Sequence, residues 1–235
     1  AGDDDTGSRA GGSGGDGGNA AATVAGNLVA VVLDEGEVGS AGAANVGGAG
    51  AAGTTVGTAT LTLDGGAAQT ISGAVTAAAD NEGAIVIANT TGNDATDDVT
   101  FSLGIGSSTA AVKSLTITDG DTEFDGDVYA RTITLDANSA AQADFDGDVT
   151  AVTLLTMGQD EATFQKDVTA ATSINFAINN GNAKMTLDGT TAQTVTGPIT
   201  ATTDASGNID VTNTAGLVTF TGTIGATANT ATIND

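Results

Sequence analysis

The sequence predicts an all-β fold, a right-handed parallel β-solenoid built from coils of roughly 20 to 30 residues. Three observations predict it: a short motif that recurs along the chain, a longer repeat superimposed on that motif, and a composition suited to narrow coils. The alternative is a pair of tandem antiparallel β-sandwiches, because the two copies of the longer repeat could each form one sandwich.

The short motif is clearest between residues 122 and 170, where TEFDGDVYA, ADFDGDVTA and ATFQKDVTA follow one another. The phenylalanines of the three copies, Phe124, Phe145 and Phe164, are 21 and 19 residues apart. In the first copy Phe, Gly, Val and Ala occupy alternate positions, which on a strand places them on one face and the polar residues on the other. A repeat of this length is typical of solenoids, in which each coil buries its apolar edge against its neighbours.

Weaker copies of the motif extend the repeat in both directions. They are Ile71–Ala77, Phe101–Ser107, Val195–Ala201 and Phe220–Ala226. Most copies follow a short apolar strand with an aspartate close behind it, such as LTLD at Leu61 or MTLD at Met185. Each period therefore holds at least two short strands and two polar turns.

The longer repeat aligns residues 63–90 with residues 187–214 at a constant offset of 124. Both copies begin with Leu-Asp-Gly, continue through Gln-Thr and end in Asn-Thr. A length difference around residues 93–97 then changes the offset to 119, and we expect that insert to be a loop.

The composition favours narrow coils over a wide core. Hydrophobic residues make up 40% of the chain, but there are only six Phe, one Tyr and no Trp to fill a large interior. The 35 glycines fit frequent tight turns. With neither Cys nor His, the chain offers no disulfide, no transition-metal cluster and no His-based acid-base catalysis.

The charge balance limits the partners. There are 29 acidic and 5 basic residues, so the net charge is -24, and nucleic acid and anionic membrane surfaces would be repelled. The longest run of bulky apolar residues, 28–33, is too short for membrane insertion. The expected partners are divalent cations, cationic polymers and other copies of the same chain.

The chain divides into three parts. Residues 1–20 are predicted to be a flexible Gly/Asp-rich arm, residues 21–60 an apolar strand followed by a Gly/Ala-rich segment, and residues 61–235 the repeat β domain. Because segment 21–33 is apolar on both faces of a strand, it must be covered on both sides. It either caps its own first coil or pairs with a neighbouring subunit. The residues predicted to serve self-assembly are Val24, Leu28, Val29, Val31, Val32 and Leu33.

Acidic residues recur at the repeat period. In coils stacked in register about 4.8 Å apart, these carboxylates would form ladders whose repulsion costs on the order of 1 kcal/mol per neighbouring pair in water. Calcium, which takes six to eight oxygen ligands, is the cofactor that would relieve it; the alternative is a solvated acidic face. The predicted metal ligands are Asp119, Asp121, Glu123, Asp125, Asp127, Asp146, Asp148 and Asp167.

Phrases such as TLTLDGGAAQTISGAVTA and ATFQKDVTA resemble the repeat regions of secreted bacterial surface proteins, namely filamentous-haemagglutinin-like adhesins, autotransporter passengers and surface-layer proteins. The resemblance covers about residues 61–228 and implies a secreted protein at the cell surface. We expect a non-enzymatic structural subunit that self-assembles into an extracellular filament, sheath or surface layer. The alternative function is an adhesin module that binds glycans or a host surface. A carboxylate-based glycan-cleaving enzyme is disfavoured, since the acids recur at the repeat period and the chain lacks the aromatic or cationic platform that such sites use.

Overall fold

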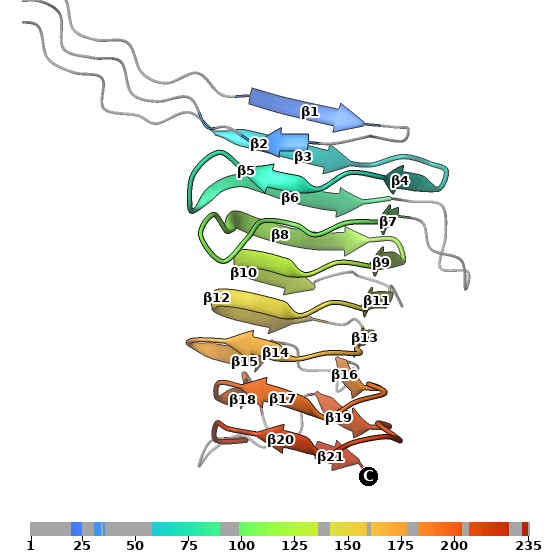
Figure 1. Ribbon diagram of the computed structural model, residues 1–235, viewed down its shortest axis with the longest axis vertical. Helices are drawn as coiled ribbons and strands as arrows, with labels where there is room; N and C mark the ends of the chain where they lie inside the picture. The colour runs from blue at the N-terminus through green and yellow to red at the C-terminus, as the bar shows by residue number, and fades with distance from the viewer. Residues whose placement is uncertain are drawn as a thin grey trace, which may run out of the picture.

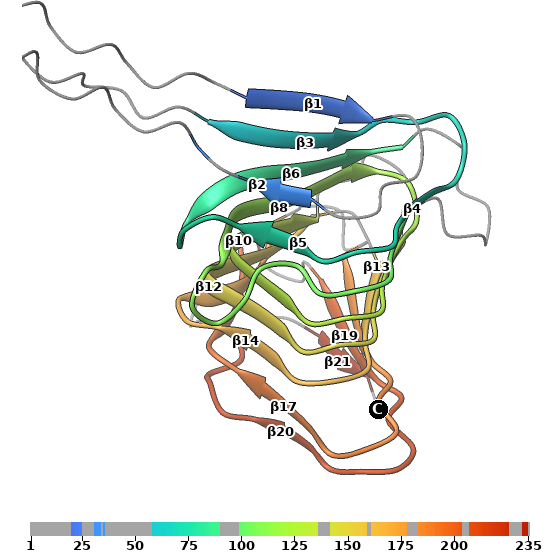
Figure 2. The ribbon, with the colours of Figure 1, turned by 45° about the horizontal axis from the view of Figure 1, so that its top comes forward.

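The structure is a computed structural model. It describes residues 20–24, 31–33, 35, 58–89, 99–135, 142–158, 161–177, 183–203, 207–225 and 232–234. The described chain is all-β and winds into a parallel β-solenoid of about six turns of roughly 23 residues. The turns stack along the long axis of the molecule (Figure 1) and enclose a common interior (Figure 2).

Each complete turn contributes a strand or a single bridge to each of three faces, which we name A, B and C. Face A contains β1 (Ala20–Val24), β3 (Ala59–Leu63), β6 (Glu82–Ala88), β8 (Val112–Asp119), the second halves of β10 (Val128–Leu135) and β12 (Val149–Met157), β15 (Ser173–Phe176) and β18 (Ile199–Ala201). Face B contains β4 (Gln69–Ile71), β7 (Val99–Phe101), β9 (Thr122–Phe124), β11 (Gln142–Phe145), β13 (Glu161–Phe164), β16 (Lys184–Leu187), β19 (Asn208–Val211) and β21 (Thr232–Asn234). Face C contains β2 (Val31–Leu33), β5 (Val75–Ala77), a bridge at Ile105, the first halves of β10 and β12, β14 (Val168–Ala170), β17 (Gln193–Thr196) and β20 (Val218–Phe220).

All pairings between the described strands are parallel, which confirms the predicted solenoid over the tandem sandwiches. The sequence pattern allowed at least two strands per period, and the structure has three faces per turn. Inward and outward residues alternate along the strands, as in β13, where Ala162 and Phe164 are buried and Thr163 is not. The inward side chains form one continuous apolar core from Leu33 to Ile209.

The short motif spans two faces, so its single-strand interpretation was wrong in one respect. Phe124 ends β9 on face B, the chain turns a corner through Asp125 and Gly126, and Val128 begins β10 on face C. The corner is tight because successive turns approach closely: a Cβ on Gly126 would lie 2.4 Å from the backbone nitrogen of Gly104. Phe124 and Val128 nevertheless both point inward, as predicted, with at most 1% of their surface exposed.

The phenylalanines of face B form a stack through the core. The ring centroids of Phe101, Phe124, Phe145 and Phe164 are 5.1, 4.6 and 5.0 Å apart in succession, and the rings are within 9° of parallel. All four side chains are fully buried. The repeat period therefore places identical aromatic rings directly above one another.

The two copies of the longer repeat occupy different faces. The second copy starts five complete turns and one face after the first, so that Leu63 lies on face A and Leu187 on face B. In the same way Gln69 lies on face B and Gln193 on face C. One sequence unit thus fits successive faces, which makes the three faces structurally near-equivalent. The predicted loop at residues 93–97 lies outside the described residues.

Parts of the apolar segment 21–33 pair within the chain, as the capping interpretation requires. β1 lies beside β3, with Val24 opposite Leu63, and β2 lies beside β5, with Val31 opposite Val75. Leu33 is buried, whereas the Val32 side chain is 68% exposed. Leu28 and Val29 lie outside the described residues.

Glu35, just beyond β2, fastens this first turn to the next ones. Its carboxylate accepts hydrogen bonds from the Gly83 backbone N–H at 3.2 Å and from the Lys113 ammonium at 3.1 Å, and Glu35 itself is buried. A buried carboxylate with a charged partner and a backbone donor is well satisfied. This contact ties residues far apart in the sequence and positions the N-terminal turn.

The phenylalanine stack generates a stability prediction. Phe145→Ala removes a fully buried ring with neighbours on both sides, and we expect a loss of about 3–5 kcal/mol of unfolding free energy. Phe145→Leu should cost roughly half as much or less, because Leu187 continues the same inward position in register with Phe164. Denaturant titration followed by circular dichroism measures both. Equal stability of Phe145→Ala and the unaltered chain would contradict the stack's role.

Candidate functional site

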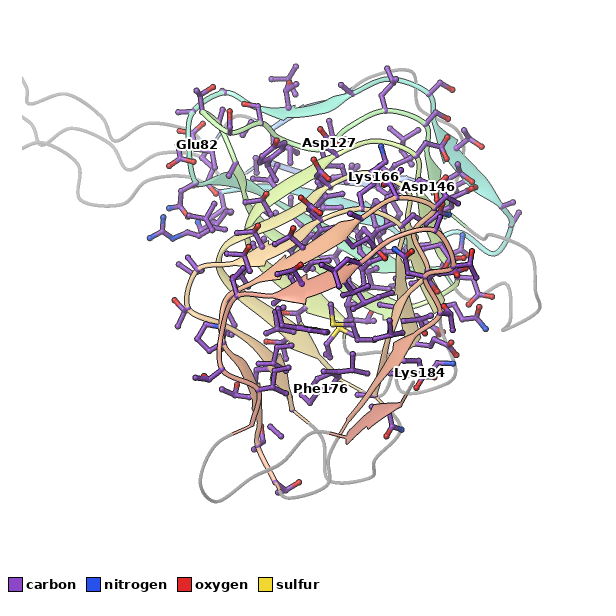
Figure 3. All side chains as sticks on the ribbon, turned by 60° about the horizontal axis from the view of Figure 1, so that its bottom comes forward. Glu82, Asp127, Asp146, Lys166, Phe176 and Lys184 are labelled. Carbon is purple, nitrogen blue, oxygen red and sulfur yellow. The ribbon has the colours of Figure 1, made fainter. Side chains whose placement is uncertain are left out.

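Most of the predicted metal ligands lie at or next to the corner between faces B and C of the middle turns. Asp125 and Asp146 occupy equivalent corner positions in successive turns, and Gln165 follows in the next one. Figure 3 labels Asp127, Asp146 and Lys166, which lie on the outside of the stacked turns. Stacking in register is the reason, since each turn delivers its acidic corner to the same side.

Three of the predicted ligands come close enough to share a cation. One carboxylate oxygen from each of Glu123, Asp125 and Asp146 lies within 4.8 Å of the others. Asp125 is exposed, and the other two are half-buried. The Gln165 side-chain amide donates a hydrogen bond to Asp146, which leaves the second Asp146 oxygen outside that bond. Carboxylate oxygens alone are the ligand chemistry of hard divalent cations such as calcium and magnesium.

A second column of acids serves the backbone. The side-chain oxygens of Asp127 and Asp148 accept hydrogen bonds from the backbone N–H groups of Asp148 and Asp167, at 2.9 and 3.2 Å. Asp167 continues the column by accepting from the Thr194 N–H at 2.7 Å. Each aspartate thus links its turn to the next one. This pattern gives these three predicted ligands a structural role at the corner.

Asp119 and Asp121 also bond to the backbone around the turn that precedes β9. Asp119 accepts a hydrogen bond from the Gly120 N–H at 3.0 Å, and the Asp121 side chain accepts one from the Gln142 N–H at 2.8 Å. Asp121 is 7% exposed. These two predicted ligands therefore lie apart from the cluster of Glu123, Asp125 and Asp146.

Two corners built around a buried glutamine, one in each copy of the longer repeat, were not predicted from the sequence. The Gln69 side chain accepts hydrogen bonds from the Gly65 N–H at 3.1 Å and the Asn89 amide at 3.2 Å. In the second copy Gln193 accepts them from the Gly189 N–H at 2.9 Å and the Asn213 amide at 2.7 Å. Both glutamines are 1% exposed. The conserved spacing of Gln and Asn between the two copies was a signal of this network, but it does not state that the amides are buried.

A second missed feature is the distribution of charge along the solenoid axis. Residues 211–234, which contain the last turn, carry no charged side chain, and neither do β1 and β2 at the other end. The acids of the described turns are concentrated between the ends. On face B, Lys184 partly compensates this negative charge. Its ammonium pairs with the Glu161 carboxylate, and its Nζ lies 3.8 Å from Oδ2 of Asp210. Among the described residues, the middle turns are thus acidic, whereas the end strands β1, β2, β20 and β21 carry no charge.

The fold and these features define the class of protein as an acidic parallel β-solenoid with a carboxylate corner and uncharged end strands. No protein-family model matches the chain, and neither a curated protein nor a solved structure matches it. Within the described ranges, no segment forms a helix of the length and apolarity needed to cross a membrane.

The glutamine corner generates the second prediction. Gln193→Leu fills the same space but removes the acceptor for Gly189 and Asn213 and the donor to the Phe164 carbonyl, which lies 2.8 Å away. Several buried polar groups lose a partner, so we expect a loss of about 2–4 kcal/mol of unfolding free energy. Gln142→Leu, at an exposed position, is the matched control and should change stability by about 0.5 kcal/mol or less. A Gln193→Leu variant that unfolds together with the Gln142→Leu control in denaturant titration would refute the assigned role.

Proposed function

We propose that the protein is a secreted, non-enzymatic structural subunit that self-assembles into an extracellular filament, sheath or surface layer. The observation that carries this proposal is the absence of charged side chains from the described end strands β1, β2, β20 and β21, on a chain of net charge -24. Copies that approach side to side bring acidic corners together and repel one another. Copies that approach through their ends avoid this cost.

Among the described strands, those at the two ends also have an edge that pairs with no other described strand. Proteins that remain monomeric usually blunt edge strands with charges, proline or bulges, because an open edge is a template for another chain. β2 and β20 end face C in the described part of the chain, and neither contains a charged residue or a proline. The apolar residues predicted to serve self-assembly, of which Val32 is 68% exposed, belong to the first of these ends. Both edges therefore have the character of association surfaces.

The acids favour a scaffold over an active site. Asp127, Asp148 and Asp167 spend a side-chain oxygen on the backbone of the next turn. Paired carboxylates in a glycoside-cleaving site are instead held free to exchange protons with a substrate. Repetition of the same contact from turn to turn serves the stacking of the turns.

Calcium remains part of the proposal, and the corner of Glu123, Asp125 and Asp146 is where the chain brings oxygen ligands together. A divalent cation there would remove the repulsion between carboxylates of successive turns. It would also lower the charge that opposes association. Calcium is thus proposed to stabilise the subunit and to support assembly.

The calcium proposal predicts opposite effects of one substitution under two conditions. Asp146→Asn keeps an oxygen that can accept the Gln165 hydrogen bond but removes one charge from the cluster. In chelator we expect the variant to melt slightly above the unaltered protein, because repulsion is relieved. In millimolar calcium only the unaltered protein should gain several degrees, since ligand binding adds to the stability of the folded state. Asp64→Asn, which removes an exposed charge elsewhere, is the control for charge alone. Identical calcium responses of all three proteins in thermal unfolding would end the calcium proposal.

The function itself is tested by imaging purified protein with negative stain, together with light scattering, in excess calcium and after chelation. We expect ordered polymers in calcium that dissolve on chelation. Polymers that ignore chelation would keep the structural function and remove calcium from it. A monomer under both conditions would overturn the structural function and favour the alternative, an adhesin module that binds glycans or a host surface.

A further inference from the structure

We propose that copies of this chain join head to tail, with the last turn of one copy continuing into the first turn of the next as if the solenoid were uninterrupted. The inference rests on the proposed self-assembling function and deepens it, because it names the two surfaces, their polarity and their register. The partner is a second copy of the chain. The backbone directions at the two ends, the exposed side chains there and the lack of charge on the end strands all favour this contact.

At the C-terminal end, the hydrogen bonds between β17 and β20 show which way the backbone groups of β20 point. The Gln193 N–H donates to the Leu217 carbonyl, and the Thr221 N–H donates to the Val195 carbonyl, both at 3.0 Å. Alternate residues of a parallel strand turn their N–H and C=O to opposite sides. The N–H and C=O groups of Val218 and Phe220 therefore point away from β17, toward the open end of the described solenoid.

At the N-terminal end, β2 presents the complementary edge. The Ala78 N–H donates to the Leu33 carbonyl at 2.8 Å, so the backbone groups of Leu33 face β5. Those of Val32, the neighbouring residue, point away from β5 by the same alternation. The Val32 side chain is also 68% exposed. No other described strand pairs with this edge of β2. It lies on face C, as the outer edge of β20 does.

The register between the two edges follows from the turns within the chain. The residues that align in register along face C are Val31, Val75, Ile105, Val128, Val149, Val168, Val195 and Phe220. In this column the N–H of the residue after the aligned one donates to the aligned carbonyl of the preceding turn. Gly106 donates in this way to Val75, and Tyr129 to Ile105, each at 2.8 Å. Applied between two copies, the rule makes the Val32 N–H the donor to the Phe220 carbonyl.

Charge and exposed apolar surface agree with this interface. Four large hydrophobic side chains of the described residues are strongly exposed, and the two most exposed are Leu217, at 74%, and Val32, at 68%. They flank the two edges that would meet. Val218, Phe220 and Ile224 in the last turn pack on the core but stay partly exposed, as they would before another turn covers them. The strands β1, β2, β20 and β21 carry no charge, and Glu35, the described acid next to β2, is buried and paired with Lys113.

Polarity distinguishes this contact from a closed dimer. Every strand pairing described within the chain is parallel, and only a head-to-tail contact keeps the pairing parallel on face C, where β20 would meet β2. Two identical ends placed together would run antiparallel. A head-to-tail contact uses two different surfaces, so it does not close on itself and produces an open polymer. The expected product is a filament whose axis is the solenoid axis.

The test uses full-length chains that carry one blocked end each. Val32→Asp adds a charge to the N-terminal edge and Leu217→Asp adds one to the C-terminal edge, both at side chains outside the core. Val32→Pro is a second N-terminal block, because it removes the outward N–H without adding charge. The matched controls are Leu103→Asp and Val152→Asp, which place the same charge at exposed apolar positions between the ends. Circular dichroism and thermal unfolding establish that every variant is folded.

We expect each end-blocked variant alone to raise the protein concentration needed for assembly about tenfold or more, because a buried apolar contact is replaced by a charge. The two controls should assemble like the unaltered chain. A mixture of Val32→Asp and Leu217→Asp retains one intact pair of ends, so sedimentation should show a one-to-one dimer that does not grow. Dimers of either variant alone would overturn the head-to-tail polarity, since like ends would then pair. Polymers of both end-blocked variants at the unaltered concentration would place assembly on the sides and overturn this inference while the proposed function stands. A monomeric unaltered chain would overturn both.

Discussion

The parallel register between successive turns is the constraint on which the rest of this molecule depends. Because each turn repeats its path about one strand spacing further along the axis, every residue meets its counterpart from the neighbouring turn. A side chain that benefits from stacking on itself is therefore multiplied along the axis. The four phenylalanines from Phe101 to Phe164 illustrate the benefit, since their parallel rings fill the core of face B without any wide hydrophobic layer.

The same register multiplies repulsion where acids align, and the chain manages it in two ways. Asp127, Asp148 and Asp167 direct an oxygen into the backbone of the next turn, which converts a ladder of like charges into a ladder of hydrogen bonds. In the neighbouring column of the same corner, Gln165 occupies the place of a third acid. Its side-chain amide donates a hydrogen bond to Asp146. Among the described residues, Glu123, Asp125 and Asp146 remain as a close carboxylate group. The proposed cation corner thus consists of the acids that remain close together after the other acids have bonded to the backbone.

Register also explains why the ends differ from the middle. Within the body each turn is covered above and below, so its outward charges cost only lateral repulsion. An end turn must either be protected or meet another chain, and in this molecule the described end strands carry no charge while the Leu217 and Val32 side chains are exposed. An acidic middle with neutral ends would direct association along the axis, because lateral approach brings like-charged corners together. The absence of charge on the end strands would then set the direction of assembly.

The sequence by itself determined the architecture, because a period near 20 residues with alternating apolar positions has few solutions other than stacked parallel coils. It also predicted that Phe124 and Val128 point inward and that acids align outside, since alternation and repetition are local properties. Only the tertiary structure decided that the motif bends at Gly126, that the second long repeat is displaced by one face, and that Gln69 and Gln193 are buried. Those features depend on how many residues each corner takes up and on which backbone groups the neighbouring turn leaves unpaired. The physical reason is that a repeat in sequence specifies what stacks on what, whereas the closing of each turn in space decides which oxygen atoms meet a backbone donor and which, as at Asp125, face solvent.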